Sequence, residues 1–152
     1  MQRRPYVSVA AVIEREGRFL MVEERTDTGR TVLNQPAGHL EPRETLVQAV
    51  QREVLEETAW HFAPAGLVGL YLYHNPDADR SYLRVCFFGP VLAHEAERAL
   101  DAEVLQCLWL DRAALAAMQG RLRTPLVNRC IDDYLAGRRF PLAVVADGAG
   151  LV

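Results

Sequence analysis

A carboxylate-rich segment restricts the fold of this chain more than any other feature of its sequence. The run Arg52-Glu53-Val54-Leu55-Glu56-Glu57 follows a loop around Gly38, and that loop holds a further carboxylate, Glu44. Like charges at this spacing repel one another in a helix, which costs stability unless something offsets the charge. Hard divalent cations are the usual partner, because they bind several carboxylate oxygens at one point. The segment therefore predicts a loop followed by a helix that carries a metal site.

Helical geometry indicates how the three carboxylates of the run are placed. At about 100° per residue, Glu53 lies between Glu56 and Glu57 on the helix surface, so the three side chains project as one cluster. The neighbouring apolar stripe should face the core, and it consists of Leu46, Val47, Val50 and Val54. The cluster is therefore expected where the helix meets the rest of the domain.

Two further charged residues are expected to brace this helix. Arg52 precedes Glu56 by four residues, so it can pair with Glu56 or with a carboxylate from the loop. Glu44 lies off the arc of the cluster, near the expected start of the helix. Pro42 suits the first helical turn, and Glu44 can reach free backbone N–H groups there.

The spacing of these residues resembles the Nudix box, the signature of the Nudix hydrolase family. The matching positions are Gly38, Glu44, Arg52, Glu53, Glu56 and Glu57, with Trp60 at the closing hydrophobic position. The chain departs from the pattern at Ala59, where the family has a glycine. Glycine would permit a left-handed helix cap, so we expect this helix to end differently or to run slightly longer. The departure removes no charged side chain, and the resemblance implies an active hydrolase.

The rest of the chain predicts one domain of strands and helices, residues 1–152, with a flexible tail at 146–152. Apolar runs predict strands at residues 6–13, 18–23, 31–35, 68–73, 81–88 and 104–110. Residues 36–38 should bend the chain into the acidic loop. Helices are expected at 111–118 and 125–135, and residues 138–145 are a candidate last strand. These elements support an α/β or α+β domain, and the resemblance implies an α/β/α sandwich with a mixed β-sheet.

Composition excludes several classes of partner. The net charge of −3 gives no basic excess for nucleic-acid binding, and no apolar run has membrane-spanning length. Cys86, Cys107 and Cys130 match no metal-ligand pattern. Without a recognisable signal peptide, they predict free thiols and a cytoplasmic protein. We expect a small-molecule substrate and no nucleic-acid or membrane partner, with a monomer and a homodimer both left open.

Nudix enzymes cleave a diphosphate linked to another moiety, and the resemblance implies that Mg²⁺, or alternatively Mn²⁺, neutralises the phosphate oxygens and activates water. It assigns the metal to Glu53, Glu56 and Glu57, with the Gly38 carbonyl as a further ligand. Glu53 is also the candidate to orient or deprotonate the attacking water.

Three more residues have roles implied by the family. Arg52 and Glu44 would pair to hold the loop on the helix. A further carboxylate commonly comes from the loop before a late strand, where this chain has Asp101 and Glu103. We favour Glu103 as an extra metal ligand or general base. A surface ion pair for Glu44 and a solvated loop acid for Glu103 stay open as alternatives.

The resemblance extends beyond the box to a subgroup of bacterial Nudix phosphatases. The similar segments are residues 34–41, 44–47, 123–127 and 139–142. That subgroup is associated with nucleoside tri- and diphosphates and with the small heteroaromatic diphosphates hydroxymethylpyrimidine diphosphate and thiamine diphosphate. It implies release of phosphate rather than the pyrophosphohydrolase reaction typical of the family.

A small heteroaromatic diphosphate needs a surface for ring stacking and a few hydrogen-bonding groups. The candidate substrate-binding residues are Asn34, Gln35, His39, Arg84 and Tyr73. Tyr71, Tyr73 and Tyr82 are more often half-buried sheet residues than stacking surfaces for a base, and Arg123 is expected at the surface. Two other functions stay open. One is a pyrophosphohydrolase for ADP-ribose or dinucleotide polyphosphates, and the other is a Nudix-fold binding module without turnover.

Overall fold

A mixed β-sheet runs through the centre of the molecule. In the computed structural model, which describes residues 4–148, its strands are ordered β11–β7–β8–β1–β5. Their bounds are β1 (Tyr6–Val12), β5 (Ala37–His39), β7 (Gly66–Asn75), β8 (Arg80–Phe88) and β11 (Phe140–Pro141). β1 and β8 are parallel, whereas the other neighbouring pairs are antiparallel. The mixed sheet expected from the sequence is confirmed.

Two smaller sheets complete the strands. One has the order β10–β3–β2, with β4 also paired to β3, and the other is the pair β6–β9. Their bounds are β2 (Glu14–Arg15), β3 (Arg18–Arg25), β4 (Thr31–Asn34), β6 (Trp60–Phe62), β9 (Val91–His94) and β10 (Val104–Asp111). β3 therefore lies between β10 and β4, and its last residues reach the edge of the candidate site.

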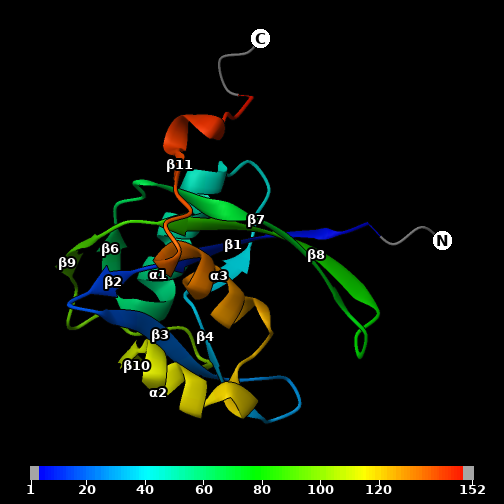
Figure 1. The fold of residues 1–152 in the computed structure, drawn as a ribbon, viewed down its shortest axis with the longest axis vertical. Helices are drawn as coiled ribbons and strands as arrows, with labels where there is room; N and C mark the ends of the chain where they lie inside the picture. The colour runs from blue at the N-terminus through cyan, green and yellow to red at the C-terminus, as the bar shows by residue number, and fades with distance from the viewer. Residues whose placement is uncertain (1–3, 149–152) are drawn as a thin grey trace.

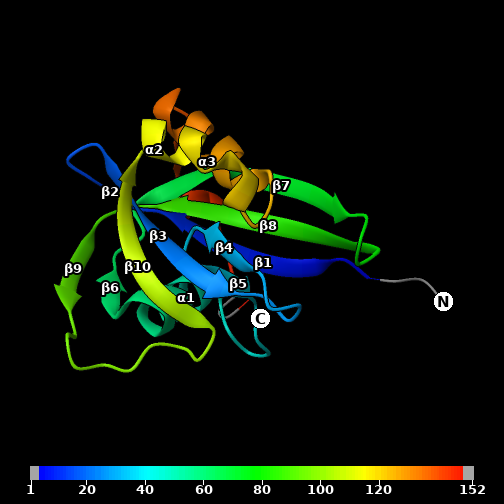
Figure 2. The ribbon, with the colours of Figure 1, turned by 90° about the horizontal axis from the view of Figure 1, so that it is seen from below.

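Helices cover both faces of these sheets. α1 (Leu46–Thr58) lies on one side, and α2 (Arg112–Ala117) and α3 (Leu126–Leu135) lie on the other, as Figure 2 shows. Two short 3₁₀ turns, η1 (Gln119–Arg121) and η2 (Leu142–Val144), follow α2 and β11. The β7–β8 hairpin extends beyond the layers (Figure 1). The α/β/α sandwich is therefore confirmed.

The apolar run in β1 explains the layering. Val9 and Ala11 belong to the core under α1, and Ala10 and Val12 belong to the core under α2 and α3. All four are almost fully buried, because successive side chains of a strand point to opposite faces of the sheet. A strand that is apolar on both faces thus requires helices on both sides.

The start of α1 differs from the expectation. The helix begins after Thr45, whose side chain accepts a hydrogen bond from the Gln48 backbone N–H while the Gln48 side chain accepts from the Thr45 N–H. This reciprocal capping box fixes the start of the helix at Leu46. Pro42 is therefore outside the first turn, and the prediction that placed it there is wrong.

The end of α1 also differs from the expectation. Ala59 adopts φ 60° and ψ 14°, which is the left-handed conformation usual for glycine, and its backbone N–H donates to the Leu55 carbonyl. The helix therefore stops where the family pattern stops it, and our expectation of a different or longer end is wrong. Ala59 is 3% exposed, so packing of its methyl group offsets part of the strain.

Two smaller differences concern chain segments outside α1. Residues 37–39 form strand β5 beside β1 rather than only a bend. The candidate last strand is limited to β11 and continues as η2. Of the tail expected at 146–152, residues 149–152 lie outside the described range, and residues 146–148 are exposed.

All three cysteines lie in the described part of the chain and are free, with Cys86 and Cys130 buried. Free thiols were expected from the sequence, and the structure confirms them. Among residues 4–148, no helix is both long and apolar enough to cross a membrane.

Candidate active site

Arg52 is the centre of the charged network on α1. Its Nε and Nη2 donate to the two carboxylate oxygens of Glu44 at 2.5 and 3.1 Å, which is a bidentate pair. Its Nη1 donates to Glu53 at 2.8 Å and to Glu56 at 3.2 Å. Nη2 also donates to the His39 carbonyl at 3.0 Å, so one guanidinium joins helix, acidic loop and β5.

Glu44 braces the acidic loop rather than the helix start. Besides accepting from Arg52, its Oε2 accepts from the backbone N–H of Glu41 at 3.0 Å. These hydrogen bonds lower the pKa of Glu44, with the bond to Arg52 as the largest cause. The loop is thereby held against the middle of α1, as the sequence predicted for this pair.

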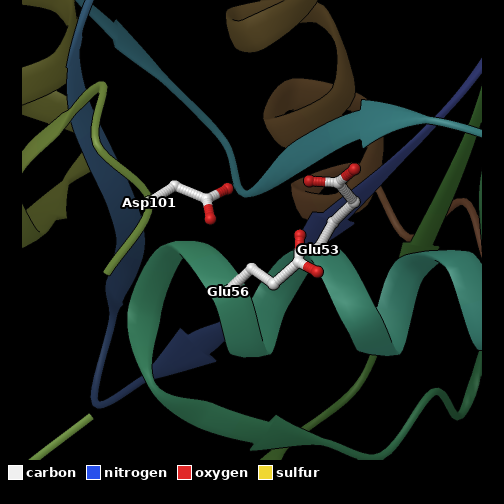
Figure 3. Close-up of side chains that lie close together, drawn as sticks. All are labelled: Glu53, Glu56 and Asp101. Carbon is white, nitrogen blue, oxygen red and sulfur yellow. The ribbon is translucent and has the colours of Figure 1, made fainter. Parts of the chain in front are cut away.

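Three carboxylates come together beside Arg52. Oxygen atoms of Glu53, Glu56 and Asp101 all lie within 4.8 Å of one another. Figure 3 shows Glu53 and Glu56 extending from α1, and Asp101 reaching toward them from the loop before β10. The Asp101 backbone N–H donates to the Glu56 carbonyl at 3.0 Å, which fixes this loop on the helix.

Glu57 lies apart from that group although it follows Glu56 directly. It is 5% exposed, and its Oε1 accepts from the Ala37 backbone N–H at 2.8 Å, which ties β5 to α1. Glu103 is exposed, and it lines the same pocket as Glu57 and Asp101. The structure therefore brings Asp101 to the carboxylate group, while metal ligation by Glu57 and Glu103 stays a prediction.

Gly38 touches the Glu53 carboxylate. A methyl group built on Gly38 would lie 2.0 Å from the Glu53 Cδ and 2.1 Å from its Oε1. Gly38 is not among the residues with positive φ, so this position requires glycine for space rather than for backbone conformation. Ligation by the Gly38 carbonyl stays a prediction.

Burial changes the acidity of two carboxylates here. It raises the pKa of Glu53 to about 7, even though the hydrogen bond from Arg52 acts in the opposite direction. Burial also raises the pKa of Glu57 well above its ordinary value, and the negative charges of Glu24, Glu53 and Asp101 add to the effect. When no cation is bound, Glu53 therefore binds a proton near neutral pH, and Glu57 holds a proton more readily than an ordinary carboxyl group.

A divalent cation fits this donor set. Glu53, Glu56 and Asp101 offer only carboxylate oxygens, the donors that Mg²⁺ and Mn²⁺ prefer, and two of them come from consecutive turns of one helix. The raised pKa of Glu53 also indicates a place where extra positive charge is favourable. The three carboxylates could therefore hold the cation.

A pocket of about 510 Å³ opens beside the carboxylates. Four of the five predicted substrate-binding residues line it, namely Asn34, His39, Tyr73 and Arg84. Gln35 lies behind the wall, 1% exposed, and its Oε1 accepts from Arg84 Nη1 at 3.1 Å. Gln35 is thus placed to orient the buried Arg84.

Other residues of this pocket were not assigned to the site from the sequence. Glu24 and Arg123 line it and form an ion pair at 2.8 Å, which brings together the end of β3 and the segment before α3. Tyr82 lies parallel to the His39 ring, with 7° between their planes and 6.0 Å between centroids. No local spacing signals the ion pair, whereas the alternation in residues 81–88 does place Tyr82 and Arg84 on one face.

Comparisons with known proteins agree with this architecture. The model of the NUDIX domain family matches residues 2–129. The chain is 37% identical over 144 residues to the phosphatase NudJ of Escherichia coli (strain K12), covering 95% of this chain and 92% of that protein. The same figures apply to the phosphatase NudJ of Shigella flexneri. NudJ represents the phosphatase subgroup expected from the sequence.

Solved structures give the same result for the fold. A NUDIX hydrolase from Nitrosomonas europaea superposes with a TM-score of 0.93 at 44% identity, covering 95% of this chain and 97% of that one. The MutT protein from Methanosarcina mazei Go1 gives a TM-score of 0.70 at 23% identity, covering 91% and 100% of the two chains. The second similarity concerns the fold alone.

Proposed function

The chain belongs to the Nudix family and is a hydrolase of phosphoric anhydrides, and we propose that it is a Mg²⁺-dependent phosphatase like NudJ. Its proposed substrates are nucleoside tri- and diphosphates and small heteroaromatic diphosphates such as hydroxymethylpyrimidine diphosphate or thiamine diphosphate. The observation that carries the proposal is the carboxylate group Glu53, Glu56 and Asp101, which lies beside a pocket of about 510 Å³. We expect the reaction in the cytoplasm, as the free thiols suggest.

The carboxylates have different parts in this proposal. Glu53, Glu56 and Asp101 would hold the cation, with Glu57 and the Gly38 carbonyl as candidate ligands on the β5 side. The bound cation would neutralise the phosphate oxygens and activate water. Glu53 is the candidate to orient that water or take its proton.

Arg52 and Glu44 position other groups of the site and do not react themselves. Their bidentate pair holds the acidic loop against α1, and the bond from Arg52 to Glu53 fixes the direction of that carboxylate. The His39 carbonyl is held by the same guanidinium. A rigid network of this kind keeps the reacting groups in place without touching the substrate.

The pocket wall supports a ring-bearing substrate. His39 and Tyr82 present parallel rings, and Tyr73 lines the pocket near them. Arg84 supplies positive charge for phosphate oxygens, held in place by Gln35. Aromatic surface for a heterocycle and a buried guanidinium for phosphate are what a nucleoside phosphate requires.

A substrate panel tests the proposal. The full-length protein with Mg²⁺ is given nucleoside tri- and diphosphates, hydroxymethylpyrimidine diphosphate, thiamine diphosphate, ADP-ribose and a dinucleotide polyphosphate. Phosphate, pyrophosphate and AMP are then measured separately. Release of phosphate is expected from the nucleoside tri- and diphosphates, from hydroxymethylpyrimidine diphosphate and from thiamine diphosphate. AMP from ADP-ribose as the main product would instead favour the pyrophosphohydrolase alternative, and binding without any product would favour a binding module.

Two variants test the roles of individual carboxylates. Glu53→Gln and Glu57→Gln should each reduce kcat by orders of magnitude while the circular dichroism spectrum is unchanged. Glu95→Gln is the matched control, because Glu95 is an exposed carboxylate outside the pocket that pairs with His61 and Arg98. Near-normal hydrolysis by either α1 variant would overturn the metal-site assignment.

A further inference from the structure

One edge of the central sheet is covered over only part of its length. The short strand β11 pairs with β7 at Gly66 and Leu67 and then ends. Residues 69–75 of β7, the free edge, have β8 on one side and no strand of residues 4–148 on the other. An edge of this kind presents a row of backbone N–H and C=O groups that a further strand can pair with.

The free edge lacks the features that usually prevent such pairing. Natural edge strands are protected by charged side chains, by proline, by bulges or by short length. β7 is ten residues long and contains no Asp, Glu, Lys, Arg or Pro. Its one shift of register against β8 lies between Leu67 and Gly69, at the end next to β11, so the free edge beyond it is regular. The strand is therefore open to pairing along seven residues.

Exposed leucines make one face of the free edge apolar. Leu70 and Leu72 are 64% and 73% exposed, and side chains two residues apart in a strand point to the same face. Leu83 lies opposite Leu72 on β8, Val7 lies opposite Leu83 on β1, and both are half-buried. The apolar surface of the sheet thus continues across three strands and ends in solvent at Leu72, where its burial would be favourable.

The two ends of the free edge carry opposite charges. Asp77 follows the free edge in the turn to β8 and is exposed. Arg138 and Arg139 are also exposed, and they lead into β11 from the side of the free edge because β11 runs antiparallel to β7. Antiparallel pairing of two free edges would place the Asp77 end of each copy at the arginine end of the other. A second copy of this chain is therefore complementary in charge at both ends.

We propose that two copies of this chain pair through their free edges, antiparallel to each other and related by a two-fold axis at Leu72. The same surface then serves both copies, as a closed dimer requires. The pairing joins two five-stranded sheets into one continuous sheet and buries Leu70 and Leu72 of each copy at the junction. Tyr73 and Asn75 line the pocket, so the interface also holds one wall of each pocket in place.

Sedimentation of the purified protein at a series of concentrations tests the dimer. A mass of about 34 kDa, twice the 17.1 kDa of one chain, is expected at about 100 µM, and it should fall toward the monomer mass on dilution. The monomer mass at every concentration up to about 100 µM would overturn the inference.

Leu72→Lys places a charge on each copy at the two-fold axis. The two ammonium groups would repel each other across the paired strands, so the dissociation constant of the dimer should rise at least about tenfold. Leu92→Lys is the matched control, because Leu92 is 69% exposed on β9, outside the free edge, and this variant should dimerise like the wild type. Both leucines are exposed, so both variants should keep their Tm. Loss of the dimer in Leu92→Lys but not in Leu72→Lys would show that a different surface is used and would overturn the proposal.

Two further measurements test the orientation and the backbone pairing. Asp77→Lys replaces attraction by repulsion at both ends of the interface, so the dissociation constant should rise by about three- to tenfold. An unchanged constant would contradict the antiparallel arrangement. Amide hydrogen exchange of residues 69–75 should be slower in the dimer than in Leu72→Lys, because pairing engages their outward N–H groups. Equal exchange rates would contradict pairing through the free edge.

Discussion

Gly38→Ala is the substitution whose effect the structure defines most closely. The added methyl group would lie 2.0 Å from the Glu53 Cδ, and 2.1 and 2.4 Å from its two oxygens. Ordinary contacts of such a carbon begin at 3.4 Å, so the carboxylate has to move by about 1.4 Å, the difference between 3.4 and 2.0 Å. The clash involves the end of a flexible side chain, so Glu53 moves and the backbone stays.

A displacement of this size should change the free energy of unfolding little and the reaction rate strongly. Metal–ligand distances tolerate changes of only about 0.2 Å, and misplacing a reacting group by about 1 Å costs on the order of 100-fold in rate. We therefore expect Gly38→Ala to reduce kcat/KM about 100-fold or more. The free energy of unfolding should change by about 1 kcal/mol or less, which is a few degrees in Tm for a domain of this size.

The assay combines Mg²⁺-dependent phosphate release with thermal unfolding of the same preparation. Gly120→Ala is the control, because nothing lies within 4 Å of a methyl group at Gly120 and its φ is not positive. It should keep both activity and Tm. Near-wild-type activity in Gly38→Ala would refute the role of the Glu53 position, and a large fall in Tm would show that the backbone moves instead.

Three other predictions concern α1. Arg52→Lys should lower kcat/KM about 10- to 100-fold with a smaller effect on Tm, because one ammonium cannot replace the bidentate pair with Glu44 and still reach Glu53. Burial raises the pKa of Glu53 to about 7, so protons compete with Mg²⁺ below that pH. In calorimetric titrations, the Mg²⁺ dissociation constant should therefore rise by up to about tenfold per pH unit as pH falls below 7, and level off above it. Ala59→Gly relieves about 1–2 kcal/mol of left-handed strain but loses about 0.8 kcal/mol of methyl burial and about 0.5–1 kcal/mol of chain entropy. Its free energy of unfolding, from urea titration, should therefore stay within about 1 kcal/mol of the wild type, and a larger change would contradict this balance.

The parts of the site that sequence reasoning predicted are those fixed by local spacing. Arg52 contacts Glu56 because the two are one helical turn apart, and the family pattern identified Glu44 as its second partner. The start of α1 could also be predicted, since Thr45 and Gln48 have the spacing of a capping box. The prediction that placed Pro42 in the first turn was wrong because it overlooked this pair. Ala59 was misjudged because a preference for glycine is not a requirement: packing of a buried methyl group makes up for the strain.

The parts that could not be predicted depend on long-range contacts. Asp101 and Glu103 are two positions apart in one loop, and what brings Asp101 to the cluster is its backbone hydrogen bond to the Glu56 carbonyl. Glu24 and Arg123 meet only because the segment before α3 is hydrogen-bonded to β4. Each pairing joins elements far apart in the chain, and neither has a spacing that a sequence can reveal.

The balance of charge explains why the acidic helix needs two kinds of compensation. The positive charge of Arg52 is permanent, and it forms ion pairs with Glu44, Glu53 and Glu56. Glu57 has a different partner, the Ala37 backbone N–H, and burial raises its pKa far above the ordinary value. The repulsion expected from the sequence is therefore only partly offset by arginine. The remaining effect is clearest at Glu53, where burial raises the pKa to about 7, so binding of a divalent cation there should release protons at neutral pH.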